Sequence, residues 1–166
     1  MSGTFASPRD LFLQLLAQML WVERTLAFEA LPALCAQAQS ESLAAAFEEH
    51  LAQTHGHVSR LEGAFRTLGA EPASARSAPA AALVKQHEEL TGTIAEPRLA
   101  DLFHAGAAIQ TEHLELAGYE LLLELARAVD GSEVAETLEA NRAEDAETLD
   151  RLRELAERLR GELPGS

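Results

Sequence analysis

The sequence predicts an all-α protein, folded as an antiparallel four-helix bundle whose long crossover carries a short extra helix. Ala, Leu and Glu dominate the chain, aromatic residues make up only 5% of it, and no alternating Val/Ile-rich stretch indicates a strand. Apolar residues instead recur every three or four positions. The chain of 166 residues, 47% of them hydrophobic, is long enough to form a core as one domain over 1–166, with the bundle over about 8–160.

The first helix is expected to begin at Pro8, with Ser7 as N-cap and Asp10 facing the free amides of the first turn. It should run to about residue 37, with Pro32 as a kink or an early end. Its apolar stripe consists of Phe12, Leu15, Leu16, Met19, Leu20, Leu26 and Ala30.

The second helix should be capped by Ser40 and ended by Gly69. A Pro-, Ala- and Ser-rich crossover linker over 70–80 follows, and then a short helix over about 80–92. The stripe of the second helix consists of Leu43, Phe47, Leu51, Thr54, Val58, Leu61, Phe65 and Leu68.

The third long helix should start at Pro97 and reach about Val129, and the fourth should follow a Ser132 cap and end near Gly161. The remaining loops are short, which makes consecutive helices antiparallel.

The composition also excludes several classes of partner. A net charge of −14 disfavours nucleic acids and anionic membranes, because such surfaces would repel the protein. No segment is apolar and long enough to span a bilayer, and no signal peptide is apparent. The single cysteine, Cys35, cannot form an internal disulfide. These features predict a cytoplasmic protein.

Each long helix carries an ionisable residue on its apolar face, given about 100° of rotation per residue. Helix one places Glu23 there, and helix two places His50 and His57, while His55 points outward. Glu112 and Asp145 take this position on the other two long helices. Carboxylates that bridge two divalent ions, completed by imidazoles, form this pattern in bundle cores.

The spacing alone also admits a core without metal. A single inward histidine is usually a core residue with a hydrogen-bond partner, and an inward glutamate often pairs with an arginine such as Arg24 or Arg60. The usual Glu-x-x-His spacing of dimetal bundles is absent from these helices. From spacing, a metal site and a hydrogen-bonded polar core both remain open.

Four stretches resemble, in order and spacing, the bacterial YciE/YciF-like ferritin-like family. They are "FLQLLAQMLWVERTLAFEALPAL", "AFEEHLAQTHGHVSRLEGAF", "AIQTEHLELAGYELLLELA" and "ETLDRLRELA". The resemblance implies a ferritin-like bundle with a dimetal-type site, a tendency to dimerise and a role in bacterial stress responses. The positions that match the family's site are Glu23, His50, His57, Glu112, His113, Glu115, Glu144 and Asp145.

The chain also departs from the family pattern. Gln53 stands where the family usually has a glutamate, and Leu149 stands near an expected acid. Each loss removes an anionic ligand, which favours one ion, a weakly held pair, or a degenerate relative of the family with a polar core. The minor helix, which begins "SAPAAALV", lacks the family's cysteine-containing stretch and early glutamate.

The leading hypothesis is a stress-associated ferritin-like protein that binds iron or manganese, as one or two ions, and takes part in metal oxidation or oxidant detoxification. A homodimer or higher homo-oligomer is expected. The alternative is a metal-free structural or interaction bundle with Trp21 and Phe28 at its interface, and a third option is a histidine-based pH sensor. The candidate metal-binding residues are Glu23, His57, Glu112 and Asp145 as direct ligands, with His50 and Glu115 as supplementary partners.

Overall fold

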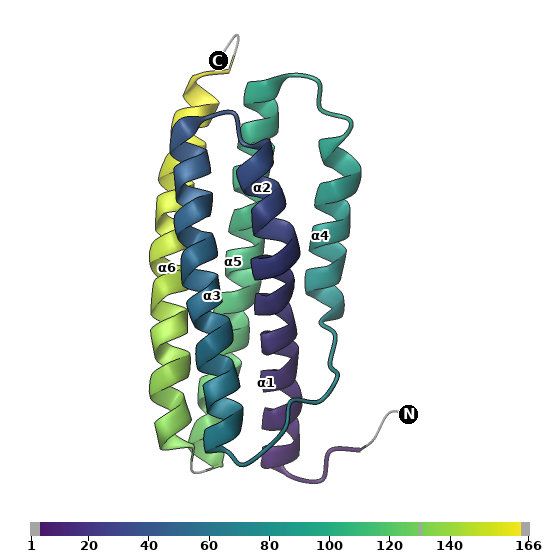
Figure 1. The fold of residues 1–166 in the computed structure, drawn as a ribbon, viewed down its shortest axis with the longest axis vertical. Coiled ribbons are helices and arrows are strands. Elements are labelled where there is room, and N and C mark those ends of the chain that lie inside the picture. The colour runs from purple at the N-terminus through teal and green to yellow at the C-terminus, as the bar shows by residue number, and fades with distance from the viewer. Residues whose placement is uncertain (1–3, 130, 164–166) are drawn as a thin grey trace.

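A computed structural model describes residues 4–129 and 131–163, and throughout these residues the secondary structure is helical. The all-α prediction is therefore confirmed. Figure 1 shows the elements in chain order: α1 (Pro8–Thr25), a π-helical segment η1 (Leu26–Ala30), α2 (Leu31–Gln37), α3 (Glu41–Thr67), α4 (Ala78–Thr91), α5 (Pro97–Ala128) and α6 (Ser132–Gly161).

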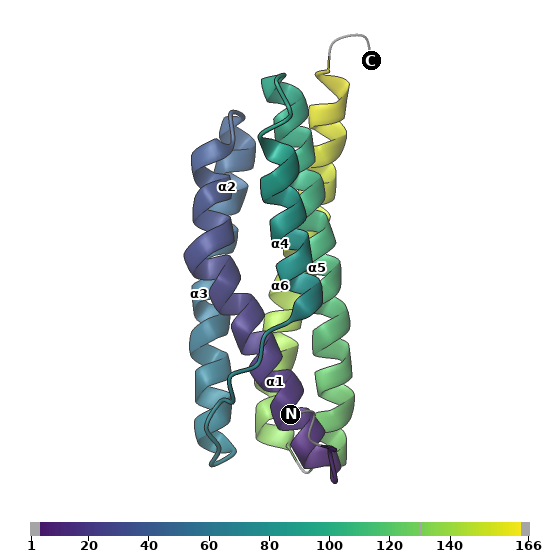
Figure 2. The same cartoon turned by 90° about the vertical axis from the view of Figure 1, so that its right-hand side faces the viewer.

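The helix α1 with its continuation α2 forms a bundle with α3, α5 and α6, whose neighbours run antiparallel (Figure 1). α5 packs against α6 and α1, and α3 packs against the same two helices from the other side. The connection after α3 leaves the lower end of the bundle, and α4 carries the chain back up along α5 (Figures 1 and 2). This is the predicted long crossover with its extra helix.

The helix starts mostly follow the sequence signals. Ser7 Oγ accepts a hydrogen bond from Asp10 N at 3.2 Å, as predicted for α1. The prediction of a Ser132 cap on α6 is wrong, because Gly131 is the N-cap and Ser132 is already helical. The Gly131 carbonyl accepts the first intrahelical bond, from Ala135 N at 2.9 Å. The predicted stop at Gly69 is confirmed, and its φ of 61° is one that glycine adopts without strain.

The start of α3 is fixed from another helix. Ser40 occupies the N-cap position, but its side chain makes no capping bond. The buried carboxylate of Asp101 on α5 instead accepts hydrogen bonds from Gln39 N at 2.9 Å and Ser40 N at 2.7 Å. Asp101 thus ties the turn between α2 and α3 to α5.

Replacement of Asp101 by alanine is expected to lower the free energy of unfolding by about 2–3 kcal/mol, because two backbone donors lose a charged acceptor. Urea denaturation measures the change. Asp150→Ala on the exposed face of α6 is the control, and should stay within about 0.5 kcal/mol of the parent protein. Equal stability of the two variants would contradict the role of Asp101.

The first helix does not break at Pro32. It continues to Gln37 through the π-helical turn at 26–30, and Leu31 N donates to Leu26 O. A proline has no N–H and crowds the carbonyl four residues earlier, which here belongs to Phe28. The wider turn ends at Ala30, two residues before Pro32, and the helix absorbs the proline instead of ending.

The extra helix α4 begins at Ala78, inside the range predicted as linker, so the linker is shorter than expected. It packs on α5, and Ala80 is its one fully buried residue. A polar contact joins the two helices where His87 Nε2 lies 2.8 Å from His104 Nδ1. Much of the apolar side of α4 is therefore not used in packing against the bundle.

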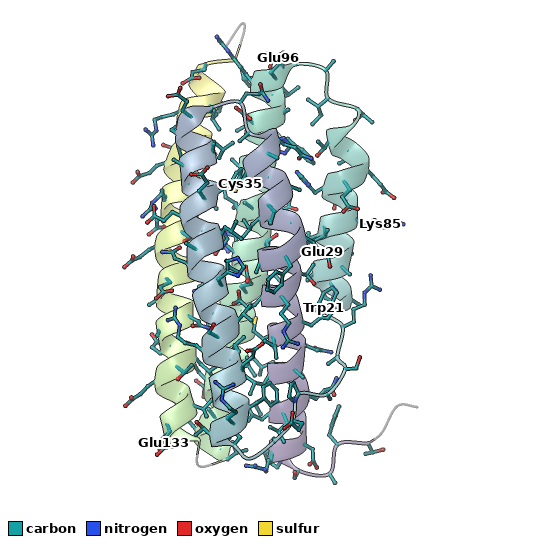
Figure 3. All side chains as sticks on the ribbon, viewed as in Figure 1. Trp21, Glu29, Cys35, Lys85, Glu96 and Glu133 are labelled. Atoms are coloured by element: carbon teal, nitrogen blue, oxygen red, sulfur yellow. The ribbon has the colours of Figure 1, made fainter. Side chains whose placement is uncertain are left out.

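Acidic side chains lie at both ends of the bundle and along its sides, as Glu96, Glu133 and Glu29 show in Figure 3. Among the described residues, no helix combines the length and the apolarity needed to cross a bilayer.

Candidate metal centre

The core of the bundle contains a polar cluster to which each of its four long helices contributes. Glu23 comes from α1, His50 and His57 from α3, Glu112 from α5 and Asp145 from α6. All five residues are buried, none more than 3% exposed. The helical periodicity placed these residues on inner faces, and the structure brings them together.

One half of the cluster is formed by Glu23, His57 and Asp145, whose potential ligand atoms lie within 4.8 Å of one another. His57 Nδ1 is 3.2 Å from Glu23 Oε1 and 3.5 Å from Asp145 Oδ1. One imidazole nitrogen and two carboxylates therefore converge on a single small volume. This donor set suits iron, manganese or zinc.

The opposite nitrogen of His57 is held from outside the cluster. His57 Nε2 is 3.0 Å from Glu144 Oε2, and Arg60 donates two hydrogen bonds to the Glu144 carboxylate, at 3.1 and 2.6 Å. The Arg60 guanidinium holds the pKa of Glu144 below its usual range. An ionised carboxylate behind a histidine fixes the tautomer and the direction of the ring, as it does behind many metal-ligating histidines.

The other half of the cluster is formed by His50, Glu112 and the same Asp145, again with ligand atoms within 4.8 Å of one another. His50 Nε2 lies 3.0 Å from Glu112 Oε1, yet neither atom makes a hydrogen bond. The two groups are close without being aligned as donor and acceptor. Asp145 belongs to both halves, which is the position of a bridging carboxylate.

Two further side chains position Glu23. The Tyr119 hydroxyl donates a hydrogen bond to Glu23 Oε1, and Asn141 Nδ2 donates to the Tyr119 oxygen at 2.9 Å. Tyr119 was not among the residues predicted for the site. Its signal was present, since Glu112, Glu115 and Tyr119 follow one another at spacings of three and four along one face of α5.

Burial and the repulsion between neighbouring like charges shift the pKa values of the side chains in the cluster. Burial together with the Glu23 charge raises the pKa of Asp145 to about 8. Burial, with Asp145 and Glu23 as neighbours, raises the pKa of Glu112 well above its usual value. Burial and the nearby His57 lower the pKa of His50 to about 3, so this imidazole is neutral at physiological pH and available as a ligand.

His57 behaves in the opposite way to His50. Burial acts to lower its pKa, but the hydrogen bond and charge of Glu23, together with Asp145, outweigh burial and raise it. In the protein without metal, a protonated His57 donates toward both Glu23 and Glu144. Its positive charge offsets part of the negative charge of the surrounding carboxylates.

Glu115 is fully buried and belongs to neither half of the cluster. Neither of its oxygens has a hydrogen-bond partner. Burial, followed by the charges of Glu23 and Asp145, raises the pKa of Glu115 well above its usual value. Its side chain also lines a separate cavity of about 180 Å³ between α1, α4 and α5.

Other residues weighed in the sequence lie outside the cluster. His55 and His113 are exposed; the ring of His55 contacts Phe28 and His113 lies beside Arg153. Gln53 accepts a hydrogen bond from Thr148 Oγ1 at 3.0 Å, and Leu149 packs as a buried apolar residue. Neither position supplies a carboxylate.

The expected apolar surface on the first helix is only partly present. Phe28 is 63% exposed. Trp21 is half-buried, and the Arg76 guanidinium from the crossover lies 5.8 Å from its ring centre. Of the two residues, only Phe28 has an exposed apolar side chain.

The donor atoms of the cluster are chemically suited to bind a cation. Buried polar atoms normally have hydrogen-bond partners, and a group of them without partners is costly unless an ion binds there. In the described part of the chain, the buried side-chain N and O atoms without a partner all come from this region, namely from His50, Glu112, Glu115, Asn141 and Asp145.

A family model described as a domain of unknown function, DUF892, matches residues 7–162. The chain belongs to this family. A curated relative is protein YciF of Escherichia coli strain K12, which is 27% identical over 146 residues, covering 85% of this chain and 87% of YciF. The resemblance to YciE/YciF-like proteins is thereby confirmed.

Solved structures agree on the fold of this family member. The crystal structure of the E. coli stress protein YciF matches with a TM-score of 0.90 and 24% identity, over 96% of this chain and 100% of YciF. YcfI from Rhodopseudomonas palustris matches with a TM-score of 0.88 and 26% identity, over 92% and 97%. A ferritin-like, diiron-carboxylate protein from Bacillus anthracis matches with a TM-score of 0.70 and 18% identity, over 92% and 99%. The predicted ferritin-like bundle is confirmed.

Proposed function

We propose that this protein is a stress-associated ferritin-like protein that binds iron or manganese in the bundle core and acts in metal oxidation or oxidant detoxification. The observation that carries the proposal is the pair of buried ligand sets that share Asp145. The buried atoms without partners support it. So do the description of YciF as a stress protein and that of the B. anthracis protein as a diiron-carboxylate protein.

We expect one or two ions, with at most one in each ligand set. Glu23 and His57 would hold the first ion, His50 and Glu112 the second, and Asp145 would contact both. When bound, redox-active ions of this kind supply electrons for the reduction of oxygen or peroxide. Because Gln53 and Leu149 provide no carboxylates, we expect weaker retention of a pair than in a centre with a full carboxylate set.

The surrounding residues hold the ligands in place. Glu144, fixed by Arg60, keeps Nδ1 of His57 directed at the first ligand set. Tyr119 keeps its proton, because burial raises the pKa of its hydroxyl well above the usual value. It therefore remains a hydrogen-bond donor to Glu23 and limits the rotation of that carboxylate.

The proposal also covers the cellular location, the assembly and the partners of the protein. We expect a cytoplasmic homodimer or higher homo-oligomer that binds neither nucleic acids nor membranes, in keeping with the net charge of −14. The exposed Phe28 beside the outward-facing His55 is a candidate contact between subunits.

Metal analysis of untagged protein, loaded with Fe²⁺ or Mn²⁺ without oxygen and then desalted, tests the proposal. We expect one to two ions per chain, as the ligand sets indicate, and consumption of peroxide or oxygen by the loaded protein. Glu23→Ala and His57→Ala should each lose the ion of the first ligand set, whereas His55→Ala on the exposed side of α3 should keep the full metal content. Folded protein that retains neither metal after loading would overturn the proposal and favour the metal-free structural bundle.

A further inference from the structure

A pocket of about 360 Å³ lies where the upper part of the first helix faces α4 and α5. In Figures 1 and 2, α4 stands at the side of the bundle along α5, and η1 and α2 face it from the first helix. Pockets that bind small molecules start at about 300 Å³. The volume therefore suits a molecule of modest size.

The walls of the pocket are mainly apolar and come from three directions. Leu26 and Leu31 line it from the first helix, Leu83 and Val84 from α4, and Ala107 from α5. Leu83, Val84 and His87 are partly buried and lie on the same side of α4 as the buried Ala80. The crossover helix thus presents an apolar wall to the pocket.

The π-helical turn forms part of this wall. Leu26, Glu29 and Ala30 all belong to η1 and all line the pocket. Glu23, a residue of the candidate centre, lies three positions before the turn. Isolated π turns within α-helices occur frequently at functional sites.

His50 connects the pocket to the candidate centre. It lines the pocket, and it is also a member of the ligand set with Glu112 and Asp145. Its side chain is 4% exposed, and neither of its ring nitrogens has a hydrogen-bond partner. A buried imidazole without partners on a mainly apolar wall is a polar anchor for a ligand.

The charge at the pocket limits which ligands can enter. Two acids line it, Glu29 from η1 and Glu88 from α4, and no lysine or arginine among the described residues does. Figure 3 shows Glu29 between the first helix and α4. With a net charge of −14 on the whole chain, an anionic ligand would be repelled.

We propose that this pocket binds a neutral, mainly apolar small molecule, with the molecule's inner end beside His50. The assignment of this molecule as a substrate rests on the proposed metal centre, whereas the binding itself does not. The pocket would then bring an organic molecule next to the second ligand set.

Fluorescence titration of the metal-free protein with N-phenyl-1-naphthylamine, a neutral apolar probe, tests the binding. We expect saturable binding of one probe per chain. The related anionic probe 1-anilinonaphthalene-8-sulfonate should bind at least tenfold more weakly, because it adds a sulfonate to nearly the same ring system. Absence of saturable binding, or equal affinity for the two probes, would overturn the proposal.

Two variants that fill the pocket locate the binding site. Ala107→Phe on α5 and Val84→Trp on α4 should each weaken binding of the neutral probe at least tenfold at unchanged helical content. Val84 lies on the peripheral helix, so its replacement tests the site even if Ala107→Phe perturbs the bundle. Ala52→Phe, at an exposed position of α3, is the control and should bind like the parent protein. Undiminished binding by folded Val84→Trp would contradict the location.

The contact between the bound probe and the candidate metal centre is measured in a separate experiment. In the metal-free protein, the probe should shift the imidazole NMR resonances of His50 and leave those of His113 unchanged. Mn²⁺-loaded protein should in addition broaden the resonances of the bound probe. If binding and the His50 shift occur but neither Fe²⁺ nor Mn²⁺ is retained, the proposed function fails and the pocket stands. Mn²⁺ binding without probe binding overturns only the pocket.

Discussion

Replacement of Asp145 by asparagine is expected to abolish tight binding of both ions, because this carboxylate is the one residue shared by the two ligand sets. Loss of a residue that merely orients a ligand already weakens metal binding by roughly 10- to 100-fold. Loss of the shared ligand should therefore weaken Mn²⁺ binding by at least about 100-fold. The electron paramagnetic resonance signal of free Mn²⁺ during a titration gives the affinity and the number of sites.

Two further variants test whether the loss of both ions is specific to the replacement of Asp145. His50→Ala should remove one class of Mn²⁺ site and leave the Glu23–His57 set, since His50 belongs to one ligand set only. Asp150→Asn, five residues further along α6 and exposed, should titrate like the parent protein. Full binding of two ions by Asp145→Asn would rule out a bridging position for Asp145.

Replacement of Glu115 by methionine is expected to stabilise the metal-free protein by about 1–3 kcal/mol. Glu115 is fully buried, and neither carboxyl oxygen has a hydrogen-bond partner. Removal of such a group relieves a desolvation penalty, and methionine has a similar length and adapts to irregular apolar surroundings. The gain appears as a higher urea midpoint at an unchanged m-value.

The exposed Glu120 on the same helix provides the matched control. Glu120→Met should change the stability by no more than about 0.5 kcal/mol. A Glu115→Met protein less stable than the parent would show that the carboxyl group is satisfied in the folded chain. A reduced gain in melting temperature on metal loading, alongside higher metal-free stability, would identify Glu115 as a supporting partner of the metal.

The parts of the site that follow from a single helix were predictable from sequence. The rotation of about 100° per residue is a local property, and it placed Glu23, His57, Glu112 and Asp145 on inner faces, where the structure has them buried. The same rule placed His55 on the outer face of its helix, where it is exposed. Most helix ends followed from caps and glycines within a few positions of the boundary, because capping is also local.

The parts that depend on distances between helices were not predictable in this way. The pairing of Glu144 with both His57 and Arg60 depends on how α3 and α6 are rotated against each other. The bonds from Gln39 and Ser40 to Asp101 join residues about sixty positions apart. Periodicity identifies the face on which a side chain lies, but not which side chain of another helix it meets. For this reason, Glu144 was expected at the site only from the family resemblance and not from the helical periodicity.

The π-helical turn at 26–30 also has no signature in the apolar pattern, and its consequence concerns the alignment of relatives. Such a turn is equivalent to one residue inserted into an α-helix. In a regular α-helix one additional residue rotates everything beyond it by about 100°, and the wide turn absorbs this rotation. Leu31 therefore keeps the direction relative to Glu23 that it would have in a regular helix one residue shorter, and it lines the pocket. A one-residue gap at this point in a homologous sequence therefore marks the loss of the wide turn, whereas the residues beyond the gap still face the same way.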